Sequence, residues 1–181
     1  MKNRFNSKIM KKIIFLLGTA REGRKSEKVF NFVLDIAKQR SDIEIQLVDI
    51  RDYPQTMTQG LSKPLTEKWR KMLKKTHGIV IVSPEYNHGY PGELKMFLDN
   101  AYEEYEGKPV AICGVSSGSV GGARMAEQLK LVLSAFQTMI INAAVYFANV
   151  NGLFDTSGAI QNRAYWEKQV NGMLDELIKY T

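Results

Sequence analysis

The segment GIVIVSPEYNHGYPG, residues 78–92, carries the pattern that decides the fold. Gly78 to Val82 is a short, almost wholly apolar run, as is typical of a strand covered on both faces. Two prolines and two glycines in the residues that follow indicate a loop with a fixed backbone path. Pro91 then precedes an amphipathic stretch, where proline favours the first turn of a helix. The segment therefore predicts a buried strand, a rigid loop and a crossover helix.

The same alternation of apolar runs and helical patterns extends over the rest of the chain. Apolar runs predict further strands at Lys12 to Leu17, Ile43 to Val48, Pro109 to Gly114 and Asn142 to Ala148. Apolar residues spaced by three and four predict helices at Ser26 to Arg40, Leu65 to Thr76, Gly92 to Tyr105, Gly121 to Phe136 and Ile160 to Tyr180. We expect an α/β fold, namely a doubly wound five-stranded parallel sheet with helices on both faces. Ser26 is expected to be an N-cap, and Asp52 to Pro64 one long surface loop.

Composition and charge indicate an ordinary globular protein. Over 181 residues, 44% are hydrophobic and 24% are charged, as in an ordinary globular domain. Part of the net charge of +6 precedes the first apolar run. We therefore predict a disordered basic leader at residues 1–11 and one folded domain at residues 12–181, with translation starting at Met1 or Met10.

Targeting and metal-binding signals are sparse. The apolar run after the leader is short and ends at Gly18, which does not suit a signal peptide, so we expect a cytoplasmic protein without a membrane segment. The single cysteine, Cys113, lies in an apolar run and is predicted to be a small buried hydrophobe. With two histidines and this one cysteine, a zinc site is not expected.

Sheets of this kind bind ligands at the carboxyl ends of their strands, so the loops there matter most. The first loop, Gly18 to Ser26, gathers glycines, hydroxyls and cations between a strand and a helix. Backbone amides at a helix start, together with Arg21 and the hydroxyls of Thr19 and Ser26, would suit a phosphate group. The alternative interpretation is a solvated turn before a capped helix.

The second loop contains the most informative side chains. Tyr86 and Asn87 place an aromatic face and an amide at the end of the buried strand, where a flat ring with polar edges would find stacking and hydrogen bonds. Two interpretations are open for Glu85, a base or an ion pair with Arg124 within or between subunits, and it is not named as catalytic.

The third loop, Val115 to Arg124, is rich in small residues that expose backbone amides. Such amides can approach a ring edge closely and donate hydrogen bonds to it. The alternative is a flexible turn in which Gly121 and Gly122 ease helix packing.

These motifs resemble the NADPH-dependent FMN reductase family, which includes quinone, azo-dye and chromate reductases of flavodoxin-like fold. The strongest motif is SPEYNHGYPG, residues 83–92, followed by Leu94-Lys95 and Leu98-Asp99. The resemblance extends from about Lys12 onward and implies FMN as cofactor, with NADPH or NADH as co-substrate. It implies hydride transfer through FMN to a small-molecule electron acceptor, which would be a quinone, an azo compound, free flavin or a metal ion. It also implies a homodimer or homotetramer, with neither membrane nor nucleic acid as a partner.

The resemblance further implies roles for individual residues. The FMN phosphate would be held by Thr19, Arg21 and Ser26; the ring and ribityl chain would be lined by Pro84, Glu85, Tyr86 and Asn87; and the pyrimidine end would meet Ser116, Ser117 and Gly118. No catalytic side chain is expected, because the flavin itself carries the chemistry. Arg24-Lys25 stand where some relatives pass directly from glycine to serine, and the segment 52–64 has no strong motif that would identify the acceptor.

Two other functions stay open at the level of sequence. One is a non-enzymatic flavin electron carrier, although the flavodoxin-type carriers we would compare with are acidic. The other is a phosphate- or nucleotide-binding module, which the basic leader and a near-match to a Walker A motif support. In that motif Arg24 stands at the lysine position and Lys25-Ser26 come one residue late.

Overall fold

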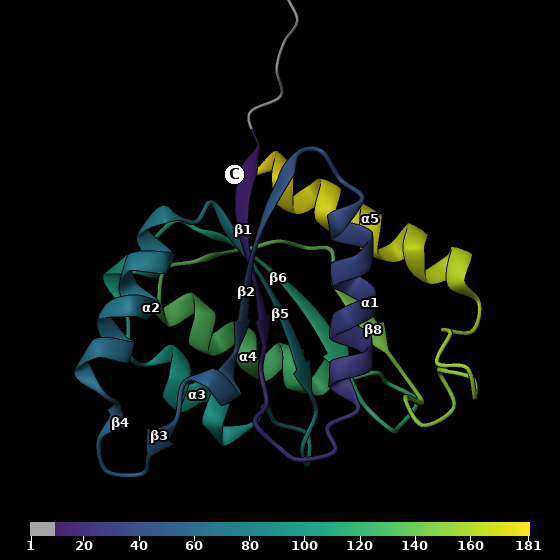
Figure 1. Ribbon diagram of the computed structural model, residues 1–181, viewed down its shortest axis with the longest axis horizontal. Helices are drawn as coiled ribbons and strands as arrows, with labels where there is room; N and C mark the ends of the chain where they lie inside the picture. Colours follow the sequence, from purple (N-terminus) through teal and green to yellow (C-terminus); the bar gives the residue numbers. More distant parts are fainter. Residues whose placement is uncertain (1–9) are drawn as a thin grey trace, which may run out of the picture.

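The computed structural model describes residues 10–181 and shows a parallel sheet between two layers of helices (Figure 1). The strands of this sheet are β1 (Lys11–Leu17), β2 (Ile43–Asp49), β5 (Gly78–Pro84), β6 (Pro109–Val115), β7 (Met139–Ile140) and β8 (Val145–Phe147). The helices are α1 (Ser26–Lys38), α2 (Lys63–Lys75), α3 (Gly92–Leu98), α4 (Ala123–Ala135) and α5 (Arg163–Lys179). The strand order is β2-β1-β5-β6, with β7 and β8 both paired to β6, and every pair is parallel. The flavodoxin-like α/β fold class is confirmed.

Side chains of β1 alternate between two hydrophobic layers. Ile13, Phe15 and Leu17 pack with residues of α1 and α5, whereas Ile14 and Leu16 pack with residues of α2, α3 and α4. All five side chains are at most 1% exposed. Burial on both faces explains why this strand is apolar throughout, instead of alternating apolar with polar residues. Figure 1 shows α1 and α5 on one side of the sheet and α2 and α3 on the other.

The lone cysteine lies within this core. Cys113 on β6 is fully buried, and its Sγ lies 3.5 Å from Sδ of Met173. Burial raises the pKa of the Cys113 thiol, which keeps the sulfur protonated and unreactive. The prediction of a small buried hydrophobe is confirmed.

The outermost strand differs from the prediction. In place of one strand from Asn142 to Ala148, two short strands, β7 and β8, flank a break, so the sheet has six strands instead of five. The backbone amides of Asn142 and Ala143 donate to the Glu176 carboxylate on α5, at 2.8 and 3.0 Å. These amides are therefore diverted from the sheet, and pairing with β6 resumes only at Val145.

Helix boundaries also differ where side chains or glycines end the helical path. The helix expected to reach Tyr105 stops at Leu98 because Asn100 Nδ2 donates to the carbonyls of Met96 and Phe97, after which a separate 3-10 turn spans Glu103–Tyr105. The helices expected from Gly121 and Ile160 begin at Ala123 and Arg163. The residues just before these starts have left-handed φ angles: 62° at Gly121, 89° at Gly122 and 52° at Asn162.

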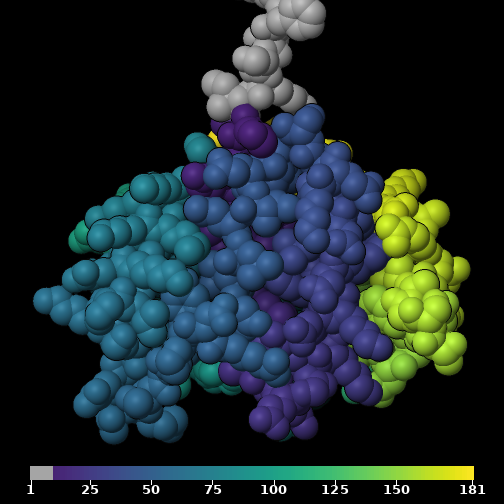
Figure 2. Space-filling model, in the orientation of Figure 1, coloured from purple at the N-terminus to yellow at the C-terminus, as the bar shows by residue number. Residues whose placement is uncertain are grey.

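The segment 52–64 is more ordered than the predicted surface loop. Two short strands, β3 (Gln55–Thr56) and β4 (Gly60–Leu61), form an antiparallel hairpin, and Tyr53 and Leu61 are buried. The space-filling view places this hairpin at the lower left of the molecule (Figure 2).

The predicted domain, residues 12–181, lies wholly within the described residues, whereas most of the predicted leader lies outside them. Of the predicted basic leader, only Met10 and Lys11 fall within the described residues, and Lys11 already begins β1. Within residues 10–181 no helix is long and apolar enough to cross a bilayer.

Candidate functional site

A cleft of about 350 Å³ opens at the carboxyl ends of the central strands. Its walls are residues 21–26 after β1, residues 84–86 at and after the end of β5, residues 115–117 at and after the end of β6, and residues 150–151 after β8. The strand order reverses beside it, because β2 lies on one side of β1 and β5 on the other. This is the place where doubly wound sheets bind ligands, and the volume suits a small-molecule cofactor.

Most of the predicted site residues come together here. The cleft is lined by Arg21, Ser26, Pro84, Glu85, Tyr86, Ser116 and Ser117, but not by Thr19, Asn87 or Gly118. Seven further lining residues were not among the predicted site residues, namely Glu22, Gly23, Arg24, Lys25, Val115, Val150 and Asn151. The rule that ligands bind at strand ends, applied to the fifth predicted strand, would have pointed to the last two.

One end of the cleft is built for an anion. Ser26 is not the N-cap that we predicted: Lys25 holds that position, and Ser26 is the first helical residue. The Ser26 hydroxyl is buried and makes no hydrogen bond to any residue of the range 10–181, although it lies in the cleft wall. Buried hydroxyls are nearly always hydrogen-bonded, so this one calls for a ligand. The start of α1 and Lys25 at its N-cap position supply positive charge, and Arg21 adds a further cation to the cleft wall.

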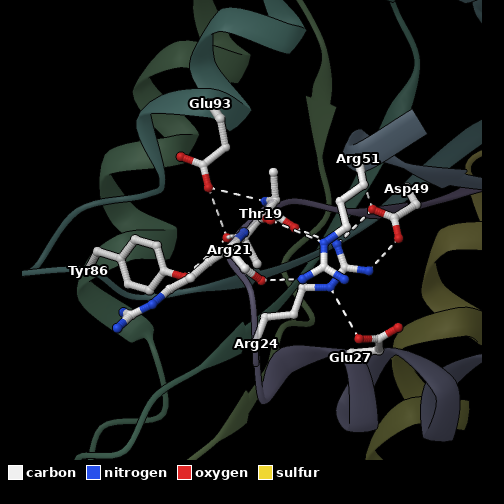
Figure 3. A network of polar contacts seen from close by, with 9 residues as sticks. Thr19, Arg21, Arg24, Glu27, Asp49, Arg51, Tyr86 and Glu93 are labelled. Carbon is white, nitrogen blue, oxygen red and sulfur yellow. Dashed lines mark hydrogen bonds and ion pairs between the residues drawn. The ribbon is translucent and has the colours of Figure 1, made fainter. Parts of the chain in front are cut away.

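Two arginine side chains donate hydrogen bonds to the backbone of the first loop, as Figure 3 shows. Arg24 is 6% exposed and binds both carboxylate oxygens of Asp49 at the end of β2, with Nη1 2.7 Å from Oδ1. Arg24 Nη1 also donates to the carbonyl of Thr19 at 2.6 Å, and Arg51 donates to the carbonyls of Ala20 and Arg21. Arginine side chains therefore bind three successive carbonyls of the loop, those of Thr19, Ala20 and Arg21.

The Arg24–Asp49 pair is electrostatically stable. Burial acts to raise the pKa of Asp49, but hydrogen bonds from the Arg24 side chain and the Arg51 amide outweigh it and hold that pKa below its ordinary value. Burial likewise acts to lower the pKa of Arg24, and its bonds to Asp49 and Glu27 raise it. Both groups stay charged, so Arg24, the cation at the lysine position of the Walker-like motif, binds the backbone and Asp49 and thereby stabilises the loop.

Tyr86 forms another part of the wall. Its backbone exchanges two hydrogen bonds of 2.9 Å with Gly89, which closes a tight turn. Asn87 and His88 occupy the central positions with φ of 48° and 70°, and Asn87 is exposed. The guanidinium of Arg21 lies 5.6 Å from the centre of the Tyr86 ring. Asn87 thus shapes the turn that presents Tyr86, since asparagine tolerates the left-handed region better than most residues.

Glu85 links the second loop to the start of α4. Its carboxylate lies 3.8 Å from Nη1 of Arg124 and accepts a hydrogen bond from the Met125 amide at 3.3 Å. The predicted ion pair with Arg124 is confirmed, and it forms within the chain. Gly121 and Gly122 lie against the backbone of Tyr146 and Gly114 in the sheet, so a side chain at either position would clash with a strand.

The third loop is fixed against the segment after β8. Ser116 Oγ and the amide of Asn149 both donate to the carbonyl of Gly118, and the Val150 amide donates to Ser116 O. Gly118 therefore supports the loop from outside the cleft wall, whereas Ser116 and Ser117 form part of it.

Comparison with known proteins agrees with this geometry. The sequence profile of the family described as NADPH-dependent FMN reductase matches residues 11–152. The chain belongs to this family. It is 34% identical over 135 residues to an NAD(P)H-dependent FMN reductase of Schizosaccharomyces pombe, a match that covers 69% of this chain and 66% of that protein. It is 29% identical to the quinone reductase of Escherichia coli, over 91% of this chain and 85% of that one.

Solved structures show the same fold at low sequence identity. The flavoenzyme NAD(P)H:(acceptor) oxidoreductase FerB of Paracoccus denitrificans superposes with a TM-score of 0.76 at 21% identity, covering 94% of this chain and 99% of that one. An FMN-dependent NADH-azoreductase of Bacillus anthracis in complex with FMN gives a TM-score of 0.60 at 16% identity, covering 92% and 99%. As a member of its family this chain is an FMN-dependent NAD(P)H oxidoreductase.

Proposed function

We propose that this protein binds FMN in the cleft and passes electrons from NADPH or NADH to a quinone, an azo compound, free flavin or a metal ion. The observation that supports this most is the buried Ser26 hydroxyl, which has no hydrogen-bond partner within residues 10–181 and lies in the wall of a cleft that is also lined by cations and by Tyr86. A phosphate would satisfy the hydroxyl, and an aromatic wall suits a flavin ring.

The proposed contacts follow the cleft wall. Ser26, Arg21, Lys25 and the amides at the start of α1 would hold the phosphate. Pro84, Glu85 and Tyr86 would line the ring and the ribityl chain, and Ser116 and Ser117 would meet the pyrimidine edge. Thr19, Asn87 and Gly118 do not line the cleft and would support the residues that do.

The redox chemistry would come from bound FMN, which can accept hydride from the nicotinamide and pass the electrons on to the acceptor. The side chains therefore need to bind and orient, and no protein nucleophile is required. The amides of the third loop would stabilise negative charge at the pyrimidine edge.

Visible spectroscopy tests this function. Purified protein supplied with FMN should show a perturbed flavin spectrum, and NADPH or NADH added without oxygen should bleach it at a rate matching turnover. Bound flavin that neither nucleotide reduces would support an electron carrier instead. Failure to bind flavin would leave the nucleotide-binding alternative.

Ser26→Ala tests the phosphate assignment. Loss of a hydroxyl that bonds a charged phosphate should weaken FMN binding by about 1.5–3 kcal/mol, while riboflavin, which lacks the phosphate, should bind as it does to the wild type. Fluorescence titration with each flavin measures the difference. Equal weakening for both flavins would contradict the assignment.

We also propose a homodimer or homotetramer. Exposed apolar side chains within the described residues, among them Val120, Leu131 and Met139, support association. Light scattering coupled to size-exclusion chromatography would decide the mass, and a monomer at micromolar concentration would oppose this proposal.

A further inference from the structure

A buried hydroxyl joins the second loop to a carboxylate outside the cleft (Figure 3). Thr19 is fully buried, and its Oγ1 lies 2.9 Å from Oε1 of Glu93 and 3.1 Å from the phenol oxygen of Tyr86. Glu93 belongs to the first turn of α3 and is not part of the cleft wall. The three side chains come from the loop after β1, the loop after β5 and α3.

The direction of these hydrogen bonds follows from counting protons. An ionised carboxylate only accepts, and a threonine hydroxyl has one hydrogen to give. Thr19 therefore donates to Glu93, and the Tyr86 phenol must donate to Thr19. The chain of donors runs from Tyr86 through Thr19 to Glu93.

These two hydrogen bonds fix the side chain of Tyr86, which lines the cleft, through the carboxylate of Glu93, which does not. Tyr86 is only partly buried, so its ring has space to rotate, and its phenol is anchored at Thr19. The Thr19 hydroxyl is in turn oriented by Glu93, whose Oε1 also accepts from the Ala20 amide at 3.2 Å. Glu93 itself is held through its carbonyl, which accepts from Gln55 Nε2 at 3.0 Å.

We propose that Glu93 is a positioning residue that acts through Thr19 to hold the Tyr86 ring in place for the flavin. The proposal rests on the proposed function, because it takes FMN as the ligand of the cleft. Thr19 Oγ1 also accepts from the Arg21 amide at 3.3 Å, but Glu93 is the acceptor of its proton. Without the carboxylate, the Thr19 hydroxyl proton turns to another acceptor, and the lone pair that receives the Tyr86 phenol is no longer fixed in the observed geometry. The ring then has to be ordered when flavin binds, which weakens binding.

Substitutions at Glu93 separate position from charge. Glu93→Leu should raise the dissociation constant for FMN about tenfold, the effect of one to two lost hydrogen bonds. Glu93→Gln keeps an oxygen that accepts from Thr19 and Ala20, so it should bind FMN within about twofold of the wild type. In a Tyr86→Phe background the phenol is already absent, and Glu93→Leu should then add little.

Comparing the dissociation constants for FMN and riboflavin shows through which loop Glu93 affects flavin binding. If Glu93 acts through Tyr86, Glu93→Leu should weaken binding of both flavins by the same factor, because both contain the ring. If it acts instead through the Ala20 amide on the phosphate loop, FMN alone would bind more weakly, and that result would overturn the proposal. Fluorescence titration of purified protein gives both constants without any measurement of turnover.

Control variants keep the result interpretable. Glu127→Leu makes the same change on the exposed face of α4, where the carboxylate pairs with Lys130, and should leave both dissociation constants within about twofold. Should circular dichroism show that Glu93→Leu is unfolded, Thr19→Val, which removes the hydroxyl at similar volume, should reproduce the equal loss. Unchanged binding by Thr19→Val would overturn the proposal. Wild-type protein that binds neither flavin would instead overturn the proposed function.

Discussion

Gly121→Ala is expected to lower the free energy of unfolding by about 3 kcal/mol or more, because the new methyl group has nowhere to go. A Cβ at this position would lie 2.6 Å from the carbonyl carbon of Tyr146, and the backbone there has φ of 62°. The clash is with the backbone of β8, which cannot rotate away as a side chain would. Urea unfolding followed by circular dichroism measures the loss.

A glycine elsewhere in the chain provides the control for Gly121. Gly172 is exposed within α5, and a Cβ there would meet nothing within 4 Å. Gly172→Ala should therefore stabilise the protein by about 0.5–1 kcal/mol, since alanine favours helix more than glycine. An unfolding midpoint of Gly121→Ala equal to that of the wild type would show that the third loop can move, contrary to its packing against Tyr146.

Arg24→Met is expected to cost about 2–4 kcal/mol of stability and to abolish measurable FMN binding. The substitution leaves Asp49, whose side chain is 20% exposed, without its bidentate partner and frees the carbonyl of Thr19. The loop that would cradle the phosphate then loses its attachment to β2. Thermal unfolding and flavin titration measure the two effects.

The acid response supplies an independent check on the Arg24–Asp49 pair. The folded pKa of Asp49 lies below its ordinary value of 3.8, so the stability that the carboxylate contributes is present above that value and is lost as the pH falls through the folded pKa. Without Arg24 the folded pKa rises, and acid unfolding should begin at a higher pH than in the wild type.

Two further variants control for the loss of a single charge at Arg24. Arg163→Met, which removes an exposed partner of Glu167, should cost less than about 1 kcal/mol. The double variant Arg24→Met with Asp49→Leu should recover part of the stability, because no unpaired charge stays buried. An Arg24→Met protein with unchanged stability and unchanged acid unfolding would contradict the role of the pair.

Local pattern was sufficient for the layers of the fold and for the loops that form the cleft. The apolar runs at β1, β5 and β6 can be recognised in each strand by itself, and they reflect burial on both faces. Because parallel strands end at one edge of the sheet, residues 21–26, 84–86 and 115–117 had to converge once those strands were recognised.

The pattern was insufficient where side chains, distant or nearby in the sequence, compete for backbone groups. The fifth strand is broken because Glu176 takes the amides of Asn142 and Ala143, and Glu176 lies 34 residues further along the chain than the first of these. The third helix ends early because Asn100 binds its last carbonyls. Neither event changes the hydrophobic period from which the elements were predicted.

The amino-acid sequence by itself determined the α/β layering, the position of the cleft and seven of its lining residues, since these depend on periodicity and on loop composition. Only the tertiary structure decided the direction of each polar side chain. Thr19 and Arg24 both lie in the first loop, yet Thr19 turns toward Tyr86 and Glu93, and Arg24 turns toward Asp49. The physical reason is that a buried polar group takes whichever partner the folded chain brings within hydrogen-bond distance, and such partners lie far away in the sequence.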